Sequence, residues 1–374
     1  MGKTPSKLIE IATRHQAFLE GHKTHIVNSY GSFLEKQAKT LRTRLKNKDL
    51  TAYSSKRFEV LLKQVDGDLK DLYKSFSGVW REQIVDLANY EAGFEVRSMS
   101  QVIDNYDFNL PSRTQLKSAV FGKPLASIEG AYKGQFINDL ISGWSSKSIQ
   151  AVEGAIRGGY YQGLTTSNIV KQIRGTVAEG FRNGTLGASN KELTLLTRTV
   201  VQHAANEARN DTWKANSDLI TGVRIIATLD DRTSDICQNY DGEVFPVDSG
   251  PRPPFHPGCR SSTVPEFDGR FSALEEGATR RERDPETGKV GDVPAKQTYY
   301  EWLKKQKPEF QNEIIGPTRA RLLRDGGLSA TRFKELGMGK NFQPLTLKEM
   351  YKKEPLVFER AGFDINDKGN VIKK

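Results

Sequence analysis

The chain has 374 residues, of which 36% are hydrophobic and 27% charged, and this length suggests two or three domains. Its mean hydropathy of −0.58 favours an elongated, helix-rich protein, and no segment approaches the roughly 20 apolar residues of a membrane span. The formal net charge of +10 favours non-specific electrostatic contact with a polyanion such as DNA, while a count of only two cysteines excludes a disulfide framework.

The N-terminal region, residues 1–105, is predicted to consist of two long helices. Its first residues lack the apolar stretch and cleavage site of a signal peptide, so we expect synthesis and assembly in the cytoplasm. Residues 8–41 carry apolar side chains in a rough seven-residue rhythm, which predicts a narrow apolar stripe on one long helix. Residues 58–88 follow a period of about 3.6 residues, and we expect the two helices to form an antiparallel hairpin.

A region of shorter helices is expected over residues 106–188. The candidate helices span residues 128–141, 148–157 and 167–173, and the polar run that begins at Thr165 is typical of an N-cap for the last of them. A longer helix, capped by Ser189 or Asn190, is expected to continue to Trp213.

A small α+β module is predicted over residues 189–268. Within it, the β-branched run 223–229 predicts a strand, and shorter strands are expected at 244–247 and near 263–265. Residues 269–296 are expected to form a linker or hairpin, and residues 297–374 a helical C-terminal tail that is loosely attached after Lys352. The fold class predicted for the whole chain is therefore mainly α with a small α+β module.

The residues with the most informative chemistry are Cys237, His256 and Cys259, which lie on either side of the predicted strand at 244–247. Thiolate and imidazole are ligands that Zn²⁺ prefers, and loops beside a β-hairpin can bring them together. A structural zinc site has four ligands, and Asp235, Asp241 or His203 is a candidate for the fourth. Two alternatives remain open: packing of both cysteines as small buried residues with His256 hydrogen-bonded to its loop, or a disulfide.

Two enzymatic alternatives also start from this segment. An acidic cluster of Asp230, Asp231, Asp235 and Asp241 near His256 could hold Mg²⁺ for phosphodiester cleavage, with Arg232 against a phosphate. A cysteine hydrolase would pair one of the two thiols with His256, but no oxyanion hole or third orienting group is evident. Aspartates are also ordinary turn residues, and the chain has no phosphate-binding glycine loop. We therefore expect no catalytic residue and no nucleotide site.

Three motif elements follow one another in this region. They are Asp-x-Arg-x-x-x-x-Cys ending at Cys237, Asp-Gly-x-x-Phe beginning at Asp241, and Pro-Pro-x-His-Pro-x-Cys-Arg ending at Arg260. Together with the helix from Leu196 to Ala208, they resemble the Mu F-like head-morphogenesis family of tailed bacteriophages in order and spacing. The family pattern usually carries two further cysteines, where this chain has Tyr240 and Ser261. That departure puts an obligatory metal in doubt.

The resemblance implies a minor head (capsid) protein in the virion. Such a protein acts in head morphogenesis, associates with the portal, is packaged inside the procapsid, and in some phages leaves with the DNA. Its expected partners are the portal protein, the major capsid or scaffolding protein, and the packaged DNA, without a membrane span. An ejection protein that interacts with the host envelope is the remaining alternative. On this interpretation the motif residues are structural and fix the loops by charge-assisted hydrogen bonds. They are Arg198, Asp231, Arg232, Asp241, Gly242, Pro254, His256 and Arg260.

Overall fold

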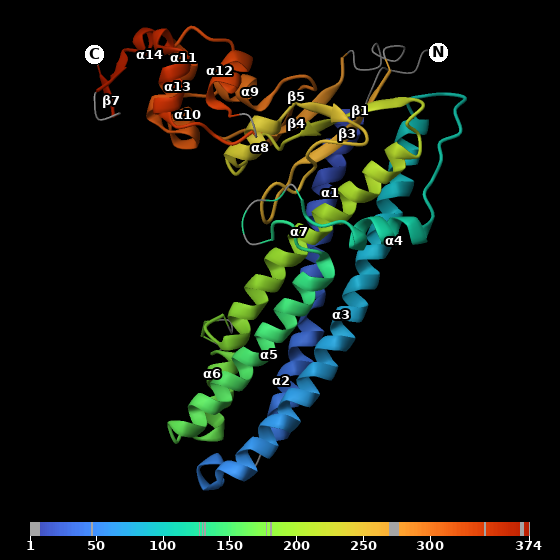
Figure 1. Ribbon diagram of the computed structural model, residues 1–374, viewed down its shortest axis with the longest axis vertical. Coiled ribbons are helices and arrows are strands. Elements are labelled where there is room, and N and C mark those ends of the chain that lie inside the picture. Colours follow the sequence, from blue (N-terminus) through green and yellow to red (C-terminus); the bar gives the residue numbers. More distant parts are fainter. Residues whose placement is uncertain are drawn as a thin grey trace.

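The structure is a computed structural model that describes residues 8–45, 48–126, 128, 130, 132–176, 178–179, 182–268, 277–339, 342–366 and 370–373. It is mainly helical with small antiparallel sheets, which confirms the predicted fold class. Figure 1 shows three parts: a long helical stalk, a β-containing module at one end of it, and a C-terminal arm that projects sideways from that module.

Helices of the N-terminal half form the stalk and its junction with the β-module (Figure 1). They are α1 (Leu8–Ser29), α2 (Gly31–Leu45), a short 3₁₀ turn (Leu50–Ala52), α3 (Ser55–Ser100), α4 (Arg113–Gly122), α5 (Ile137–Tyr161), α6 (Thr166–Arg174) and α7 (Thr185–Lys214). The prediction of a single helix over residues 8–41 is wrong, because the helix is interrupted between α1 and α2. Ser29 and Gly31 are poor helix formers, and Tyr30 between them turns into the core to hydrogen-bond Thr197.

Helix α3 is the longest element, and its 46 residues span about 69 Å. The Ser54 side chain caps its first turn, and its apolar face packs against α2, α5 and α7. The predicted antiparallel hairpin is present, because α2 runs down the stalk and α3 returns along it (Figure 1). Trp80 and Trp144 lie in a continuous apolar core that also contains Val200 of α7.

Two predictions for the middle of the chain are wrong in detail. The two helices expected at 128–141 and 148–157 form one helix, α5, which begins only at Ile137. Helix α7 begins at Thr185, before the expected caps. Its N-cap is Gly184, where an added Cβ would lie 2.2 Å from Gly175 N. Ser189 instead hydrogen-bonds Ser148 of α5 at 2.5 Å between hydroxyl oxygens.

The β-module consists of a three-stranded antiparallel sheet and a separate hairpin. Its elements are β1 (Ile220–Ile226), α8 (Asp235–Tyr240), β2 (Val244–Pro246), β3 (Ser262–Phe267), β4 (Thr279–Arg283) and β5 (Val290–Pro294). The strand order in the sheet is β2-β1-β3, so the first strand is central and pairs with both others. The three strands and the hairpin lie where they were expected. Of the predicted linker, residues 269–276 lie outside the described residues, as do residues 1–7.

The C-terminal arm has its own apolar core around Trp302, Leu322 and Phe358. Its elements are α9 (Tyr299–Lys304), α10 (Pro308–Ile315), α11 (Pro317–Asp325), α12 (Ala330–Gly337), α13 (Leu347–Lys353), α14 (Pro355–Arg360), β6 (Phe363–Ile365) and β7 (Val371–Lys373). The expected loose attachment after Lys352 is wrong, because Phe358 is fully buried in that core. Among the described helices, none is long and apolar enough to cross a membrane.

A buried polar network joins the stalk to the β-module. Glu91 of α3 accepts two hydrogen bonds from Arg209 of α7, at 2.7 and 3.0 Å, and lies 2.7 Å from His15 Nε2 of α1. The same guanidinium lies 3.3 Å from Glu95 and donates to Ser262 at the start of β3. These side chains are almost completely buried, so the network fixes how α1, α3 and α7 meet the sheet.

Candidate metal centre

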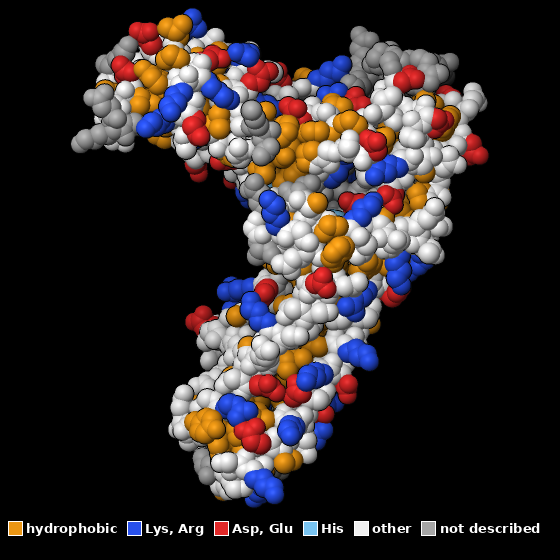
Figure 2. Space-filling view, viewed as in Figure 1, with side chains coloured by type: hydrophobic (Ala, Val, Ile, Leu, Met, Phe, Trp, Pro, Cys, Tyr) orange, Lys and Arg blue, Asp and Glu red, His pale blue; other side chains and the backbone are white. Residues whose placement is uncertain are grey.

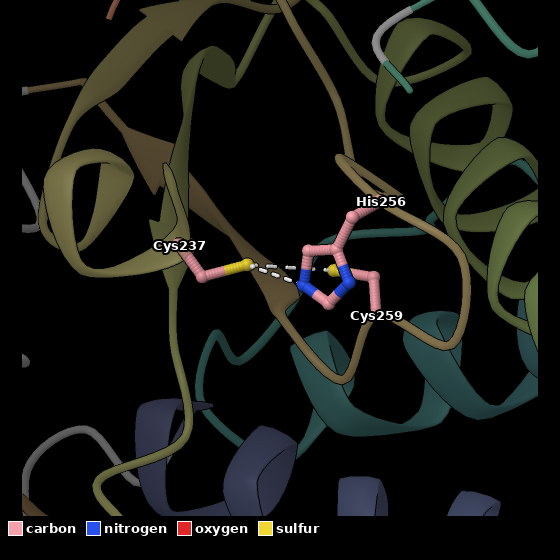
Figure 3. A group of neighbouring side chains, drawn as sticks. All are labelled: Cys237, His256 and Cys259. Atoms are coloured by element: carbon pink, nitrogen blue, oxygen red, sulfur yellow. Dashed lines mark hydrogen bonds between the residues drawn. The ribbon is translucent and has the colours of Figure 1, made fainter. Parts of the chain in front are cut away.

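Cys237, His256 and Cys259 converge on one point in the β-module, and their side chains face one another in Figure 3. The Cys237 sulfur lies 3.3 Å from His256 Nε2 and 3.6 Å from the Cys259 sulfur. All three ligand atoms lie within 4.8 Å of one another, and both thiols are free and buried. The sequence therefore selected three residues that the fold does bring together.

Two segments position these side chains. Cys237 lies on α8, a short helix that was expected to be a loop, and the other two residues lie on the loop between β2 and β3. That loop is anchored to α7, because Gly258 N donates to Thr199 Oγ1 at 3.0 Å, and Gly258 itself has a positive φ of 74°. Pro254, one of the motif prolines, is joined to Pro253 by a cis peptide bond.

The stalk also contacts the loop of the candidate metal centre, through residues that the sequence did not indicate. Lys23 of α1 is 1% exposed, and its ammonium donates to Glu20, to Gln202 of α7 and to the Cys259 carbonyl, at 2.5, 2.7 and 3.4 Å. Gln202 in turn donates to the Ser261 carbonyl at 2.7 Å. The backbone on both sides of Arg260 is thus held by polar groups from two helices.

The electrostatics favour a thiolate at Cys259. Burial opposes ionisation there, but hydrogen bonds from Cys237 and His256 outweigh it and lower the pKa of Cys259 well below its usual value. Burial likewise opposes protonation of His256, yet the interaction with the Cys259 sulfur raises the pKa of this histidine. A buried thiolate beside an imidazole is a soft donor set for a cation.

None of the three candidates for a fourth ligand lies in this group. The Asp241 carboxylate is paired with Arg280, His203 contacts the Val120 carbonyl at 3.3 Å, and Asp235 is exposed at the start of α8. Within the described residues, no other His, Cys, Asp or Glu joins the three.

Asp230 is the aspartate that fixes the motif loop, although it is not among the motif residues that we expected to be structural. It accepts two hydrogen bonds from Arg260, at 2.5 and 2.8 Å, one from the Arg232 backbone and one from Thr233. This bidentate pair lowers the pKa of Asp230 despite its burial. The expected role of Asp231 is not seen, because its side chain is exposed, and the Arg232 side chain is 64% exposed and reaches Asp230 only at 3.7 Å.

Asp241 connects three parts of the protein. Its carboxylate accepts backbone N–H groups from Ala227, after β1, and from Tyr299 of α9, both at 2.7 Å. It also forms a two-pronged ion pair with Arg280 of β4, with both N–O distances 3.0 Å. The next residue, Gly242, has a φ of 80° at the turn into β2, where an added Cβ would lie 3.1 Å from Thr298.

Arg198 performs a different task from the one expected. It lies on α7 and contacts Glu20 and Thr24 of α1, at 3.5 and 3.3 Å, so it joins two helices and does not hold a motif loop. Arg198 was grouped with the motif because the helix from Leu196 to Ala208 resembles the start of the family domain, but its side chain contacts α1.

Three features of the structure bear on the enzymatic alternatives. Two of the four aspartates, Asp230 and Asp241, are neutralised by arginines, and the acidic cluster does not form a metal-binding group among the described residues. For a cysteine hydrolase, both thiols are at most 2% exposed, so a substrate carbonyl has no path to them. His256 Nδ1 is also engaged by the Pro257 carbonyl at 3.0 Å rather than by a carboxylate.

Next to the motif loop, an open cleft of about 520 Å³ lies between α1 and the β4–β5 hairpin. Five arginines line it: Arg14, Arg232, Arg260, Arg281 and Arg283. Ala17, Ile226 and Val290 contribute apolar surface to it. The motif residues Arg232 and Arg260 thus line this cleft. It could not be predicted from the sequence, because its other walls come from segments that are distant in the chain.

Residues 150–264 match the family described as Phage Mu protein F like protein. The matched range begins inside α5, ends in β3 and includes the whole Cys-His-Cys group. The match confirms the resemblance identified from the sequence motifs, and it begins earlier than the module expected from residue 189. Neither a curated protein nor a solved structure matches the chain.

Proposed function

We propose that this protein, whose residues 150–264 form a Mu F-like region, is a minor head protein of a tailed bacteriophage. It binds the portal during head morphogenesis and is packaged inside the procapsid. The observation that carries the proposal is the family match over the segment in which the motif residues hold the β-module together. Their use as structural ties supports an assembly protein and gives no support to an enzyme.

The surface supports contact with other head proteins. The cleft is lined by five arginines and by three carboxylates, those of Glu20, Asp230 and Glu282, together with apolar side chains. This excess of guanidinium groups suits an acidic segment of a protein partner. On the face shown in Figure 2, basic and acidic side chains alternate along the stalk without a continuous basic stripe. The positive net charge therefore favours weak, non-specific contact with packaged DNA over a dedicated DNA groove.

Co-expression with the portal protein of the same phage tests this proposal. We expect a stoichiometric complex on size exclusion, and protection of the protein from added protease once procapsids have assembled. Charge reversal in the cleft, by Arg232→Glu with Arg283→Glu, should weaken the complex by roughly tenfold. Reversal of the exposed Lys56 at the far end of the stalk, by Lys56→Glu, is the matched control and should leave it unchanged. Absence of portal binding, together with metal-dependent DNA cleavage by the pure chain, would contradict the proposal in favour of a nuclease.

A further inference from the structure

We propose that Cys237, His256 and Cys259 bind one zinc ion whose fourth ligand is an oxygen. The oxygen belongs either to Ser261 or to a water molecule that Ser261 and Ser234 hold. This site is separate from the proposed portal function and does not depend on it.

Two of the three separations between the ligand atoms are close to those around a tetrahedral ion. Bond lengths of about 2.3 Å to sulfur and 2.0–2.1 Å to nitrogen, at tetrahedral angles, separate two sulfurs by about 3.8 Å and sulfur from nitrogen by about 3.6 Å. The observed separations are 3.6 Å between the sulfurs and 3.3 Å from Cys237 to His256 Nε2. For these two pairs an ion requires shifts of a few tenths of an ångström, and the third pair, Cys259 Sγ and His256 Nε2, lies within 4.8 Å. A disulfide would require the sulfurs to approach to about 2.05 Å.

The histidine presents the correct nitrogen. His256 Nδ1 lies 3.0 Å from the Pro257 carbonyl, which can only accept a hydrogen bond, so Nδ1 carries the proton. Nε2 is the nitrogen on the side of the Cys237 sulfur, 3.3 Å away (Figure 3), so it can give up its proton and ligate an ion that the thiols share. A carbonyl that fixes the tautomer in this way is the usual outer-shell partner of a metal-binding histidine.

Two buried hydroxyls account for the fourth position. Ser261 is 1% exposed, and neither its Oγ nor that of Ser234 finds an oxygen or nitrogen partner among the residues that the structure describes. Both hydroxyls lie near enough to the Cys237 thiol to lower its pKa, against the larger effects that raise it. Unpartnered hydroxyls are costly in a protein interior. Ser234 precedes Cys237 at the start of α8, and Ser261 follows Cys259 by two residues, so both come from the segments that carry the thiols. A metal-bound oxygen would give both hydroxyls a partner.

Metal analysis of the full-length protein, purified in reductant without added chelator, is the first test. We expect one zinc per chain, and substitution by Co²⁺ should give thiolate-to-cobalt charge transfer together with visible bands of tetrahedral intensity. A chain that carries no zinc and gives no thiolate-to-cobalt absorption overturns the proposal. A disulfide between Cys237 and Cys259 in the protein as isolated from the cytoplasm, before any metal is removed, would overturn it as well.

Variants of Ser261 test the fourth ligand without removing the three others. Ser261→Cys supplies a third thiolate as the fourth ligand and should tighten zinc binding by at least roughly tenfold, with a shift of the cobalt bands toward those of a three-sulfur site. Ser142→Cys, at an exposed position on α5, adds the same thiol far from the site and is the matched control. Equal zinc affinity and cobalt spectra for the two variants would overturn the assignment of the fourth position to Ser261.

Discussion

Replacement of Asp241 by alanine is expected to lower the free energy of unfolding by about 3–5 kcal/mol, the usual cost of removing one partner of a buried ion pair. The carboxylate is fully buried, and its partner Arg280 is 1% exposed. Without it, the guanidinium keeps its charge in the interior, and the backbone N–H groups of Ala227 and Tyr299 lose their acceptor. The three partners of the carboxylate lie on β4, directly after β1 and on α9. Its removal should therefore destabilise the β-module and the C-terminal arm together.

Urea unfolding followed by circular dichroism measures this loss. Asp231→Ala is the matched control, because this neighbouring motif aspartate is exposed, and it should change the free energy of unfolding by no more than about 0.5 kcal/mol. Adding Arg280→Met to Asp241→Ala should restore part of the loss, since the uncompensated charge disappears. Equal stability of the Asp241→Ala and Asp231→Ala variants would show that the network does not hold these parts together.

The sequence predicted local structure well where the signal is local. Apolar periodicity located α3, the β-branched run located β1, and the turn beginning at Asp284 located the β4–β5 hairpin. The three residues of the candidate metal centre were found for a similar reason, since thiol and imidazole side chains are rare and soft-ligand chemistry makes them conspicuous. The family motif, confirmed over residues 150–264, supplied the order of the elements around them.

Partners distant in the sequence could not be found in this way. Arg280 lies in a segment expected to be a linker or hairpin, and nothing in the sequence indicated that it is the buried counter-ion of Asp241. Lys23 lies on an amphipathic helix among other charged residues, and only the folded structure shows that its ammonium meets Gln202 and the Cys259 carbonyl. The choice between Asp230 and Asp231 failed for the same reason, because the two are adjacent in sequence and only the position of Arg260 distinguishes them.

The second large effect is a dependence of stability on pH through Glu95. This side chain is fully buried on α3, and burial raises its pKa from 4.5 to about 7. Arg209 opposes the shift, Glu91 adds to it, and Trp213 Nε1 donates to the carboxylate at 3.3 Å. Glu95→Gln should remove the titration while keeping the shape of the side chain. Relative to the wild type, the variant is expected to gain about 3 kcal/mol of stability between pH 4 and pH 8.

The sign follows from proton binding. Between the unfolded pKa of 4.5 and the folded value of about 7, the folded state keeps a proton that the unfolded state has released. Rising pH therefore costs the folded wild type stability in this window, and the cost is complete above pH 7. Other buried groups also titrate, among them His203, whose pKa is lowered by burial, so only the difference between variant and wild type isolates Glu95.

Glu59→Gln is the control for this difference. Glu59 lies on the same helix but is exposed, and its hydrogen bond to Arg157 lowers its pKa, so its carboxylate is ionised in both states above pH 5. The stability difference for Glu59→Gln should therefore stay constant from pH 5 to pH 8, while that for Glu95→Gln grows steadily. Urea unfolding at four pH values across this range would measure both stability differences. A constant difference for Glu95→Gln would mean that Arg209 keeps this carboxylate ionised, and that the buried junction carries two paired carboxylates and not one.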